Sequence, residues 1–205
     1  MVEGQLNKSG LNPDNFRKTL NGKEINLYTL RNSEGNEVSL TNYGGAVVAI
    51  MVPDKNGRLA NVIQGHDNID DVINSPEPFL STLVGRYANR IAKGKFVLNG
   101  KDYYLAINNG PNHLHGGPTG FHTKVWEVER VDERAIVLRN VSPYYEEGFP
   151  GELSMAVMFT FTDNNELIID YKGTCNKKTI VNMTHHGFFS LAGIANPTPS
   201  AENVI

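Results

Sequence analysis

Adjacent histidines, His185 and His186, lie within residues 181–193 (VNMTHHGFFSLAG), a stretch that otherwise has the composition of a buried β-strand. An imidazole changes its charge near neutral pH, with an ordinary pKa of about 6.5, so it can donate or accept a proton or bind a metal. Successive side chains of a strand point to opposite faces, so the two rings cannot both face one pocket. Three further histidines gather in NHLHGGPTGFH: His113, His115 and His122.

The spacing of His113 and His115 is one that can bind a metal. In a strand both rings would project from the same face, as zinc or copper ligands do, and His186 could supply a third ligand. The alternative is a strand end followed by a turn at Gly116-Gly117, with hydrogen-bonded rings. Because no Cys, Asp or Glu lies at a ligand-like spacing in this stretch, we predict no metal site.

A second polar group, Asn89 and Arg90, lies between apolar residues in VGRYANRIAKGKF. A guanidinium in a half-buried strand needs hydrogen-bond acceptors, and sugar hydroxyls or carboxylates are the usual ones in a polar pocket. Pairing with a structural Asp or Glu is the alternative. We expect Arg86, four residues earlier, to have the structural role.

The elements that must position these side chains are predicted to be β-hairpins. Asn99-Gly100 tolerates the positive φ angles of a type I′ turn, and four other pairs of β-branched or aromatic runs flank turn residues. A short helix is predicted at residues 68–75, before Pro76 and Pro78. We therefore predict an all-β sandwich. The five hairpins cover residues 24–44, 46–65, 94–107, 125–141 and 153–174.

The composition limits the class of protein. The chain has 205 residues, of which 40% are hydrophobic and 20% charged, so we expect one domain over residues 1–205. A formal net charge of -3 without a basic stripe argues against nucleic-acid and membrane-surface partners. Cys175 is the only cysteine, which rules out an intrachain disulfide and fits a reducing compartment. The sequence has no signal-like or membrane-spanning apolar run, so a cytoplasmic protein is predicted.

Four motifs of the sequence occur in a fixed order and spacing. They begin with TNYGGAVV, VGRYANRI, GFHTKVWEV and SPYYEEGF and cover residues 41–57, 84–117, 120–128 and 142–193. Together they are similar to the aldose 1-epimerase, or galactose mutarotase, family, and the resemblance runs from about Leu27 to the end of the chain. His185 stands where most relatives have Asn, and Tyr144-Tyr145 stands where many have Asp-Gly, a change expected only to reshape a loop.

The resemblance implies a large antiparallel β-sandwich of the galactose mutarotase type. It also implies an enzyme that interconverts the α and β anomers of free hexoses such as glucose or galactose. Such enzymes open and reclose the pyranose ring with one acid and one base, without metal or cofactor. In the family pattern His186 is the general acid, and His115, also catalytic, hydrogen-bonds the ring-oxygen side or a neighbouring hydroxyl. Asn89, Arg90 and His115 bind the substrate, and His185 points away from the sugar.

The last ten residues, NPTPSAENVI, resemble the start of a strand without a return limb. In the family, the general base is a Glu near the C-terminal end of a longer chain, and a substrate-binding Asp precedes it. Glu202, the only acidic residue after His186, does not match that motif. The resemblance therefore predicts the N-terminal part of a family chain, which alone binds sugar weakly and turns over little. An open sheet edge would favour self-association.

Three other functions are compatible with parts of the pattern. A sugar-binding module would hold a saccharide in the same pocket without a competent acid–base pair, and polarimetry of anomer exchange separates the two. A metal-dependent hydrolase or cupin-like protein would use His113, His115 and His186 and contain metal. A glycosidase would need two carboxylates, for which Glu146 and Glu147 are available, although we expect both to be solvated in a loop.

Overall fold

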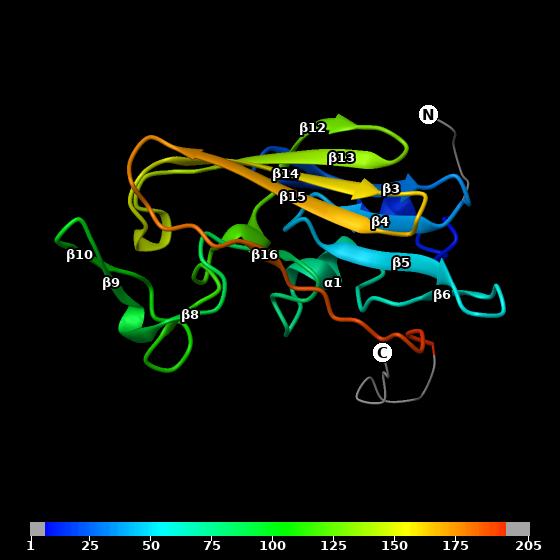
Figure 1. Ribbon diagram of the computed structural model, residues 1–205, viewed down its shortest axis with the longest axis horizontal. Coiled ribbons are helices and arrows are strands. Elements are labelled where there is room, and N and C mark those ends of the chain that lie inside the picture. The colour runs from blue at the N-terminus through cyan, green and yellow to red at the C-terminus, as the bar shows by residue number, and fades with distance from the viewer. Residues whose placement is uncertain (1–6, 196–205) are drawn as a thin grey trace.

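Strands make up most of the regular structure in residues 7–195, the part of the chain that the computed structural model describes (Figure 1). The predicted unpaired strand near Pro197, Pro199 and Glu202 lies outside these residues. The strands are β1 Lys18–Leu20, β2 Lys23–Ile25, β3 Leu27–Arg31, β4 Glu37–Thr41, β5 Val47–Pro53, β6 Leu59–Asn61, β7 Leu83–Val84, β8 Arg90–Ile91, β9 Lys95–Leu98, β10 Lys101–Tyr104, β11 His113–Leu114, β12 Glu127–Val131, β13 Ala135–Ser142, β14 Leu153–Phe161, β15 Leu167–Cys175 and β16 Thr184–His185. The helical segments are α1 Ile69–Ile73 and the short 3-10 turns η1 Pro13–Phe16, η2 Ala92–Gly94, η3 Phe121–Thr123 and η4 Glu146–Gly148. Within the described range, no helix has the length and apolar character needed to cross a membrane.

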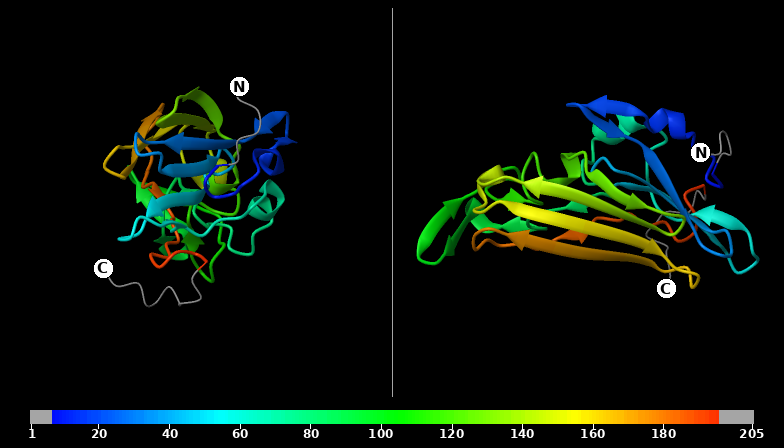
Figure 2. Two further views of the ribbon diagram at one scale, coloured as in Figure 1. Left: turned by 90° about the vertical axis from the view of Figure 1, so that its right-hand side faces the viewer. Right: turned by 90° about the horizontal axis from the view of Figure 1, so that it is seen from above.

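Two four-stranded antiparallel sheets form the body of the molecule. One has the strand order β3-β4-β5-β6 and the other β12-β13-β14-β15 (Figures 1 and 2). A core between them contains the buried side chains of Trp126, Phe159 and Phe161, which pack with Leu40 and Val47 of the first sheet. Burial of each such side chain contributes about 1.5–3 kcal/mol, so this core holds the two sheets together. The predicted all-β sandwich is confirmed.

All five predicted hairpins are present. The β9–β10 turn has Asn99 at φ 53° and Gly100 at φ 74°, as a type I′ turn requires. Its hairpin extends from one end of the molecule (Figure 1). The predicted helix is α1, where the Oδ1 of Asn68 accepts a hydrogen bond from the Asp71 backbone N–H at 2.9 Å and caps the helix.

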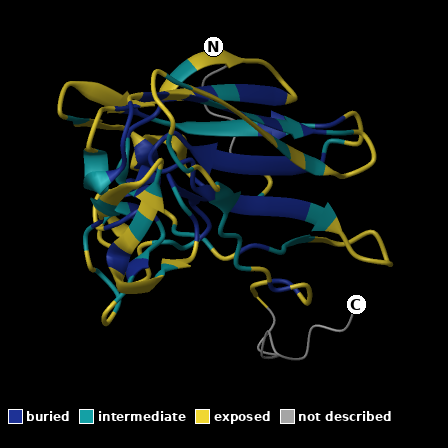
Figure 3. Cartoon of the chain, turned by 60° about the vertical axis from the view of Figure 1, so that its left-hand side comes forward, coloured by how far each residue is buried: buried dark blue, intermediate teal, exposed yellow. Residues whose placement is uncertain are grey.

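The inner strands β4 and β5 are buried along most of their length instead of alternating between buried and exposed residues (Figure 3). The cause is a second apolar cluster that covers the outer face of this sheet. It includes Val48 of β5, Phe16 of η1, Ile25 of β2, and Ile69 and Val72 of α1. The short N-terminal elements and α1 therefore act as a third layer over the sheet.

The strand β15 is the edge of its sheet, and among the described residues it pairs only with β14. The right-hand view of Figure 2 shows it along the margin of the sheet. Two apolar cavities follow its inward face, one of about 480 Å³ beside Leu167 and Ile169, and one of about 290 Å³ beside Tyr171, Gly173 and Cys175. Within the described residues, the two sheets are therefore not closed against each other along β15.

Candidate active site

Two short strand pairs bring the predicted site residues together from distant parts of the sequence. Strand β16 pairs with β7, and the pairing continues past it: the His186 N–H donates to the Thr82 carbonyl at 2.8 Å, and the Ser81 N–H donates to the His186 carbonyl at 3.0 Å. Strand β11 pairs with β8 and places Leu114 opposite Arg90. These backbone hydrogen bonds thus fix the main-chain positions of both histidine motifs.

The rings of His115 and His186 meet edge to face, with centroids 5.1 Å apart and an interplanar angle of 89°. Phe79 packs against His115 at a centroid distance of 4.7 Å, and Phe188 stacks on His186 at 5.0 Å. Aromatic contacts of this kind restrict ring orientation. Neither ring nitrogen of His186 has a hydrogen-bond partner among the described residues, so both remain available to a ligand.

The protonation of His115 is set by a backbone group. The Asn89 N–H donates to the Nδ1 of His115 at 2.9 Å, and an accepting nitrogen carries no proton, so the proton of the neutral ring is on Nε2. Burial lowers the pKa of His115, and the neighbouring His186 and Arg90 lower it further, while Glu77 opposes the shift. His115 is therefore held as a neutral N–H donor.

Asn89 and Arg90 lie beside this ring pair, and both are exposed. The Oδ1 of Asn89 accepts from the Arg90 backbone N–H at 2.8 Å, and the Nε of Arg90 donates to the Oδ1 of Asn109 at 2.9 Å. The expectation that the Arg90 guanidinium is half-buried is wrong, because β8 is only two residues long and Arg90 lies at the surface. Its partner is an amide instead of a carboxylate, and its terminal NH2 groups have no partner among the described residues.

The two glycines after His115 both have positive φ angles, and Gly116 also makes a close approach to backbone. A Cβ at Gly116, where φ is 84°, would lie 1.8 Å from the carbonyl oxygen of Gly85. A Cβ at Gly117, where φ is 91°, would lie 2.2 Å from the Oε2 of Glu147. At Gly116 only glycine fits both the space and the positive φ; at Gly117 the neighbour is a flexible side chain, and the positive φ is what favours glycine. This glycine pair therefore fixes the turn that carries His115.

His113 does not share a face with His115. It is fully buried, its Nδ1 lies 2.7 Å from the Ala106 carbonyl oxygen, and its ring packs edge-on against Phe149 at 5.3 Å. The shared strand face on which a His113–His115 metal pair would depend is absent, because His115 has φ 54° and lies after the end of β11. In residues 7–195, no group of three or more His, Cys, Asp or Glu side chains is arranged to hold a metal ion.

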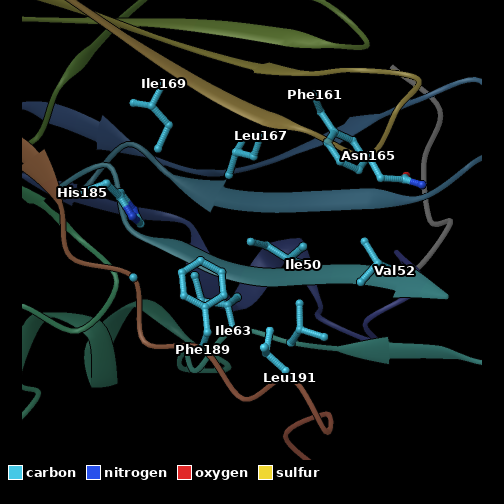
Figure 4. Close-up of a pocket in the computed structure, with 12 residues that line it drawn as sticks. Ile50, Val52, Ile63, Phe161, Asn165, Leu167, Ile169, His185, Phe189 and Leu191 are labelled. Atoms are coloured by element: carbon cyan, nitrogen blue, oxygen red, sulfur yellow. The ribbon is translucent and has the colours of Figure 1, made fainter. Parts of the chain in front are cut away.

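His185 points to the opposite side of β16 from His186, as strand alternation predicts. Its ring lies 6.0 Å from that of Phe159 and lines the larger cavity beside β15, among the aliphatic side chains of both sheets (Figure 4). Its Nε2 has no hydrogen-bond partner among the described residues. Burial lowers the pKa of His185 to about 4, so this ring is neutral near pH 7.

His122 and Phe79 are part of the cluster, although sequence reasoning gave neither of them a role. His122 is buried against Phe79 at a centroid distance of 4.5 Å, and its Nδ1 has no hydrogen-bond partner in the described part of the chain. Burial lowers the pKa of His122 to about 4. The clustering of histidines was the one sequence signal for His122. Phe79, a single aromatic residue after two prolines, had no sequence signal that pointed to the site.

Arg86 has the structural role that the sequence predicts. It is 2% exposed, and its guanidinium donates five hydrogen bonds of 2.8–2.9 Å. All five acceptors are neutral oxygens, so the charge is solvated by the protein's own dipoles. The contacts tie residues 142–151 to the strand that enters the site. The acceptors are the Oγ and carbonyl oxygen of Ser142 and the carbonyl oxygens of Pro143, Pro150 and Gly151.

The Glu146 side chain is only 15% exposed, so the expectation that both loop carboxylates are solvated is wrong for Glu146. Glu146 pairs with the Nζ of Lys124 and accepts from the hydroxyl of Ser142. Glu147 accepts from the backbone N–H of Thr119 at 2.7 Å. Both side chains therefore hold the loop in place, and a glycosidase that used this pair would first have to break these bonds.

We expect the protein to lose stability as the pH falls from about 6.5 to about 4. His122 and His185 have a pKa of about 4 in the folded protein, whereas both protonate near pH ~6.5 when unfolded. Between about pH 6.5 and about pH 4 the unfolded state therefore binds more protons than the folded state. Each neutral ring contributes on the order of 2–3 kcal/mol to the free energy of unfolding above about pH 6.5, and this contribution is lost as the pH falls to about 4. Urea unfolding across the window measures the loss. His122→Gln, which cannot titrate, should remove about half of the pH dependence; an unchanged dependence would contradict the assignment.

Comparison with known proteins relates the sequence to one family. The sequence model of the family described as aldose 1-epimerase matches residues 26–203. The galactose mutarotase of Bos taurus is 44% identical over 160 residues, which are 78% of this chain and 46% of that protein. The aldose 1-epimerase of Escherichia coli (strain K12) is 34% identical over 172 residues, 84% of this chain and 49% of that protein. The chain spans about half the length of the curated relatives it matches.

Solved structures share the fold. The GalM/aldose epimerase homologue from C. elegans aligns with a TM-score of 0.77 at 31% identity, covering 80% of this chain and 50% of that chain. The galactose 1-epimerase from Lactobacillus acidophilus NCFM aligns with a TM-score of 0.75 at 26% identity, covering 85% of this chain and 51% of that chain. The sequence match and the shared β-sandwich agree, and the chain belongs to the aldose 1-epimerase family.

Proposed function

We propose that this chain supplies the acid side of an aldose 1-epimerase site, which interconverts the α and β anomers of a free aldohexose such as galactose or glucose. The observation that carries the proposal is the His115–His186 pair, in which one ring is fixed as a neutral donor and the other has both nitrogens available. A cytoplasmic location and an uncharged sugar ligand, instead of a nucleic acid or a membrane, belong to the same proposal.

In the proposed reaction, a base removes the proton of the C1 hydroxyl while protonated His186 donates its proton to the ring oxygen. The bond between C1 and the ring oxygen breaks, and C1 becomes an aldehyde. Rotation about the C1–C2 bond and closure on the other face, with the proton transfers reversed, give the other anomer. No redox change or cofactor is needed to balance this exchange.

The roles of the two histidines differ because of the Asn89 backbone. A second proton on His115 would occupy Nδ1 and break the hydrogen bond from the Asn89 N–H. His115 therefore suits a donor that binds the ring-oxygen side or a hydroxyl through its Nε2–H. His186, which has no such constraint, suits the acid that gains and loses the proton.

The exposed side chains beside the rings suit a ligand with many hydroxyl groups. The Nε of Arg90 is oriented by Asn109, which leaves its other N–H groups to donate to sugar oxygens. The side-chain NH2 groups of Asn89 and Asn109 add further donors. Among the described residues, no carboxylate is hydrogen-bonded to His115 or His186. The carboxylate of Glu77 acts on His115 only electrostatically, by raising its pKa. A small carboxylate in the buffer can therefore act as the base in a test of the acid side.

We expect the chain, in acetate buffer, to accelerate the mutarotation of α-D-galactose above the rate of the buffer alone. Acetate would accept the C1 hydroxyl proton and His186 would donate to the ring oxygen, so the added rate should rise with acetate concentration. Polarimetry measures the rate, and the NMR signals of the histidine ring protons report sugar binding. A chelator should leave the rate unchanged.

A matched control is Arg90→Met, which should raise the galactose concentration needed for half-maximal rate while leaving the maximal rate close to that of the unmodified chain. Sugar-induced shifts without any added rate would favour the sugar-binding module. If neither the sugar-induced shifts nor the added rate is observed, the proposed function is contradicted.

A further inference from the structure

Ser81 connects the segment before β7 to the segment that carries His186. Its N–H donates to the His186 carbonyl at 3.0 Å, and its carbonyl accepts from the Val47 N–H at 2.9 Å. Its hydroxyl donates to the Gln64 carbonyl at 2.9 Å and accepts from the Phe188 N–H at 3.3 Å. Ser81 is 0% exposed, so these contacts do not depend on what covers the surface.

The hydroxyl of Ser81 closes a cycle of three hydrogen bonds. The Ser81 Oγ donates to the Gln64 carbonyl, the Gln64 N–H donates to the Phe188 carbonyl at 2.8 Å, and the Phe188 N–H donates back to the Ser81 Oγ. Linked hydrogen bonds polarise and strengthen one another. The cycle therefore holds both the N–H and the carbonyl of Phe188, and Ser81 contributes the only side chain in it.

Phe188 is the ring on which His186 is stacked, with centroids 5.0 Å apart and an interplanar angle of 26°. The backbone of His186 is fixed separately, by its hydrogen bonds to Ser81 and Thr82. Those bonds place the Cα of His186, whereas the direction of its ring is restricted by the rings beside it, Phe188 and His115. The orientation of His186 therefore depends on the hydroxyl cycle that holds Phe188.

The backbone conformation at Ser81 shows what the hydroxyl adds. Ser81 has φ 51°, in the left-handed region where residues other than glycine are uncommon. Strained residues of this kind persist where their surroundings fix them, and they cluster at functional sites. Glycine would adopt the same φ without strain, but it would leave the Gln64 carbonyl and the Phe188 N–H without the hydroxyl.

We propose that Ser81 is a positioning residue for the general acid: its hydroxyl holds Phe188 against His186 and so sets the direction in which His186 presents its proton. The inference rests on the proposed function for the role of His186 as the acid. Displacement of a reacting group by about 1 Å can cost about 10²-fold in rate. Because Ser81 is fully buried, loss of its hydroxyl should slow proton delivery without removing a contact to the sugar.

The test compares Ser81→Gly and Ser81→Ala, which both remove the hydroxyl. Glycine relieves the positive φ and alanine does not, so Ser81→Gly should be the more stable variant in urea unfolding. Both variants should nevertheless lower the maximal rate of anomer exchange in acetate buffer by about 10- to 100-fold. The galactose concentration for half-maximal rate should stay close to that of the unmodified chain. A role in folding alone would make the rate follow the stability instead.

The NMR signals of the histidine ring protons give a readout that does not require activity. A proton that lies over an aromatic ring has a shifted signal, so loss of the Phe188 stack should move the His186 signals toward their positions in the unfolded chain. Comparison with His186→Gln assigns these signals. The signals of His113, which packs on Phe149, should stay in place. Phe188→Leu, which leaves the hydroxyl intact, should reproduce both the rate loss and the movement of the His186 signals.

The matched control is Ser39→Ala, which removes another buried hydroxyl. Ser39 is 1% exposed on β4, and its Oγ accepts from the Nδ2 of Asn7 at 3.1 Å and lies 3.0 Å from the hydroxyl oxygen of Thr29. This change should lower the stability but leave the rate and the His186 signals unchanged. Circular dichroism checks that each variant is folded.

The inference is overturned if the His186 signals of folded Ser81→Gly coincide with those of the unmodified chain. It is also overturned if Ser81→Gly retains the rate of an active unmodified chain, or if Ser39→Ala moves the His186 signals as far. If the unmodified chain itself adds no rate, the proposed function has failed, and the His186 signals alone decide whether the hydroxyl sets the ring.

Discussion

Replacement of His186 by glutamine should lower the protein-dependent rate of anomer exchange by about 10²- to 10⁴-fold, the usual contribution of a positioned acid. Glutamine has a similar size and can still donate a hydrogen bond, but it cannot deliver a proton to the leaving ring oxygen. The ring contacts with Phe188 and His115 are lost, yet the backbone bonds to Ser81 and Thr82 remain. Polarimetry in acetate buffer measures the change.

The neighbouring histidine provides the control. His185→Asn should change the rate by less than about threefold, because the His185 ring lies in the apolar cavity beside β15 and does not touch the pair that handles the proton. Equal losses in His185→Asn and His186→Gln would show that the two rings have been assigned to the wrong sides of the strand.

Removal of the Arg86 side chain should have the largest effect on stability. In Arg86→Met, the buried oxygens of Ser142, Pro143, Pro150 and Gly151 lose their donors, and each unsatisfied group costs about 1–3 kcal/mol less any water that enters. We expect the free energy of unfolding to fall by about 3–5 kcal/mol. Urea unfolding near neutral pH measures the difference.

Arg90→Met is the matched control for this change, since it removes the same group four residues later. Arg90 is exposed and its one side-chain bond is to Asn109, so its loss should cost less than about 0.5 kcal/mol of stability. A similar loss of stability in both variants would mean that the network around Arg86 is not what holds residues 142–151 in place.

The hairpins could be predicted because their signals are local. The Asn99-Gly100 turn and the strands beside it are encoded within a few residues, and the same holds for the cap of α1 at Asn68. The burial of β4 and β5 on both faces could not be predicted in this way. It depends on Phe16, Ile69 and other residues far away in the sequence that fold over the outer face of the sheet.

In the candidate site, too, the local features could be predicted and the contacts between distant residues could not. Strand alternation correctly separated His185 from His186, because β16 is regular at that point. The same rule failed for His113 and His115, because His115 has a positive φ and the strand has already ended. His122 and Phe79 come next to the pair only through tertiary packing, and a pattern read along one chain does not contain that contact.

The glycine pair that follows His115 also limits how this site can change during evolution. A side chain at Gly116 would collide with the Gly85 backbone carbonyl, and one at Gly117 would have an unfavourable positive φ and would displace the Glu147 carboxylate. Selection should therefore remove most mutations of these two codons. Exposed positions beside the histidine pair, such as Arg90, can change more freely, because the Arg90 side chain lies at the surface and its one hydrogen bond is to the Asn109 side chain. Divergence in ligand preference within the proposed sugar site should therefore arise by exchange of these exposed side chains, while the turn that carries the histidine is inherited unchanged.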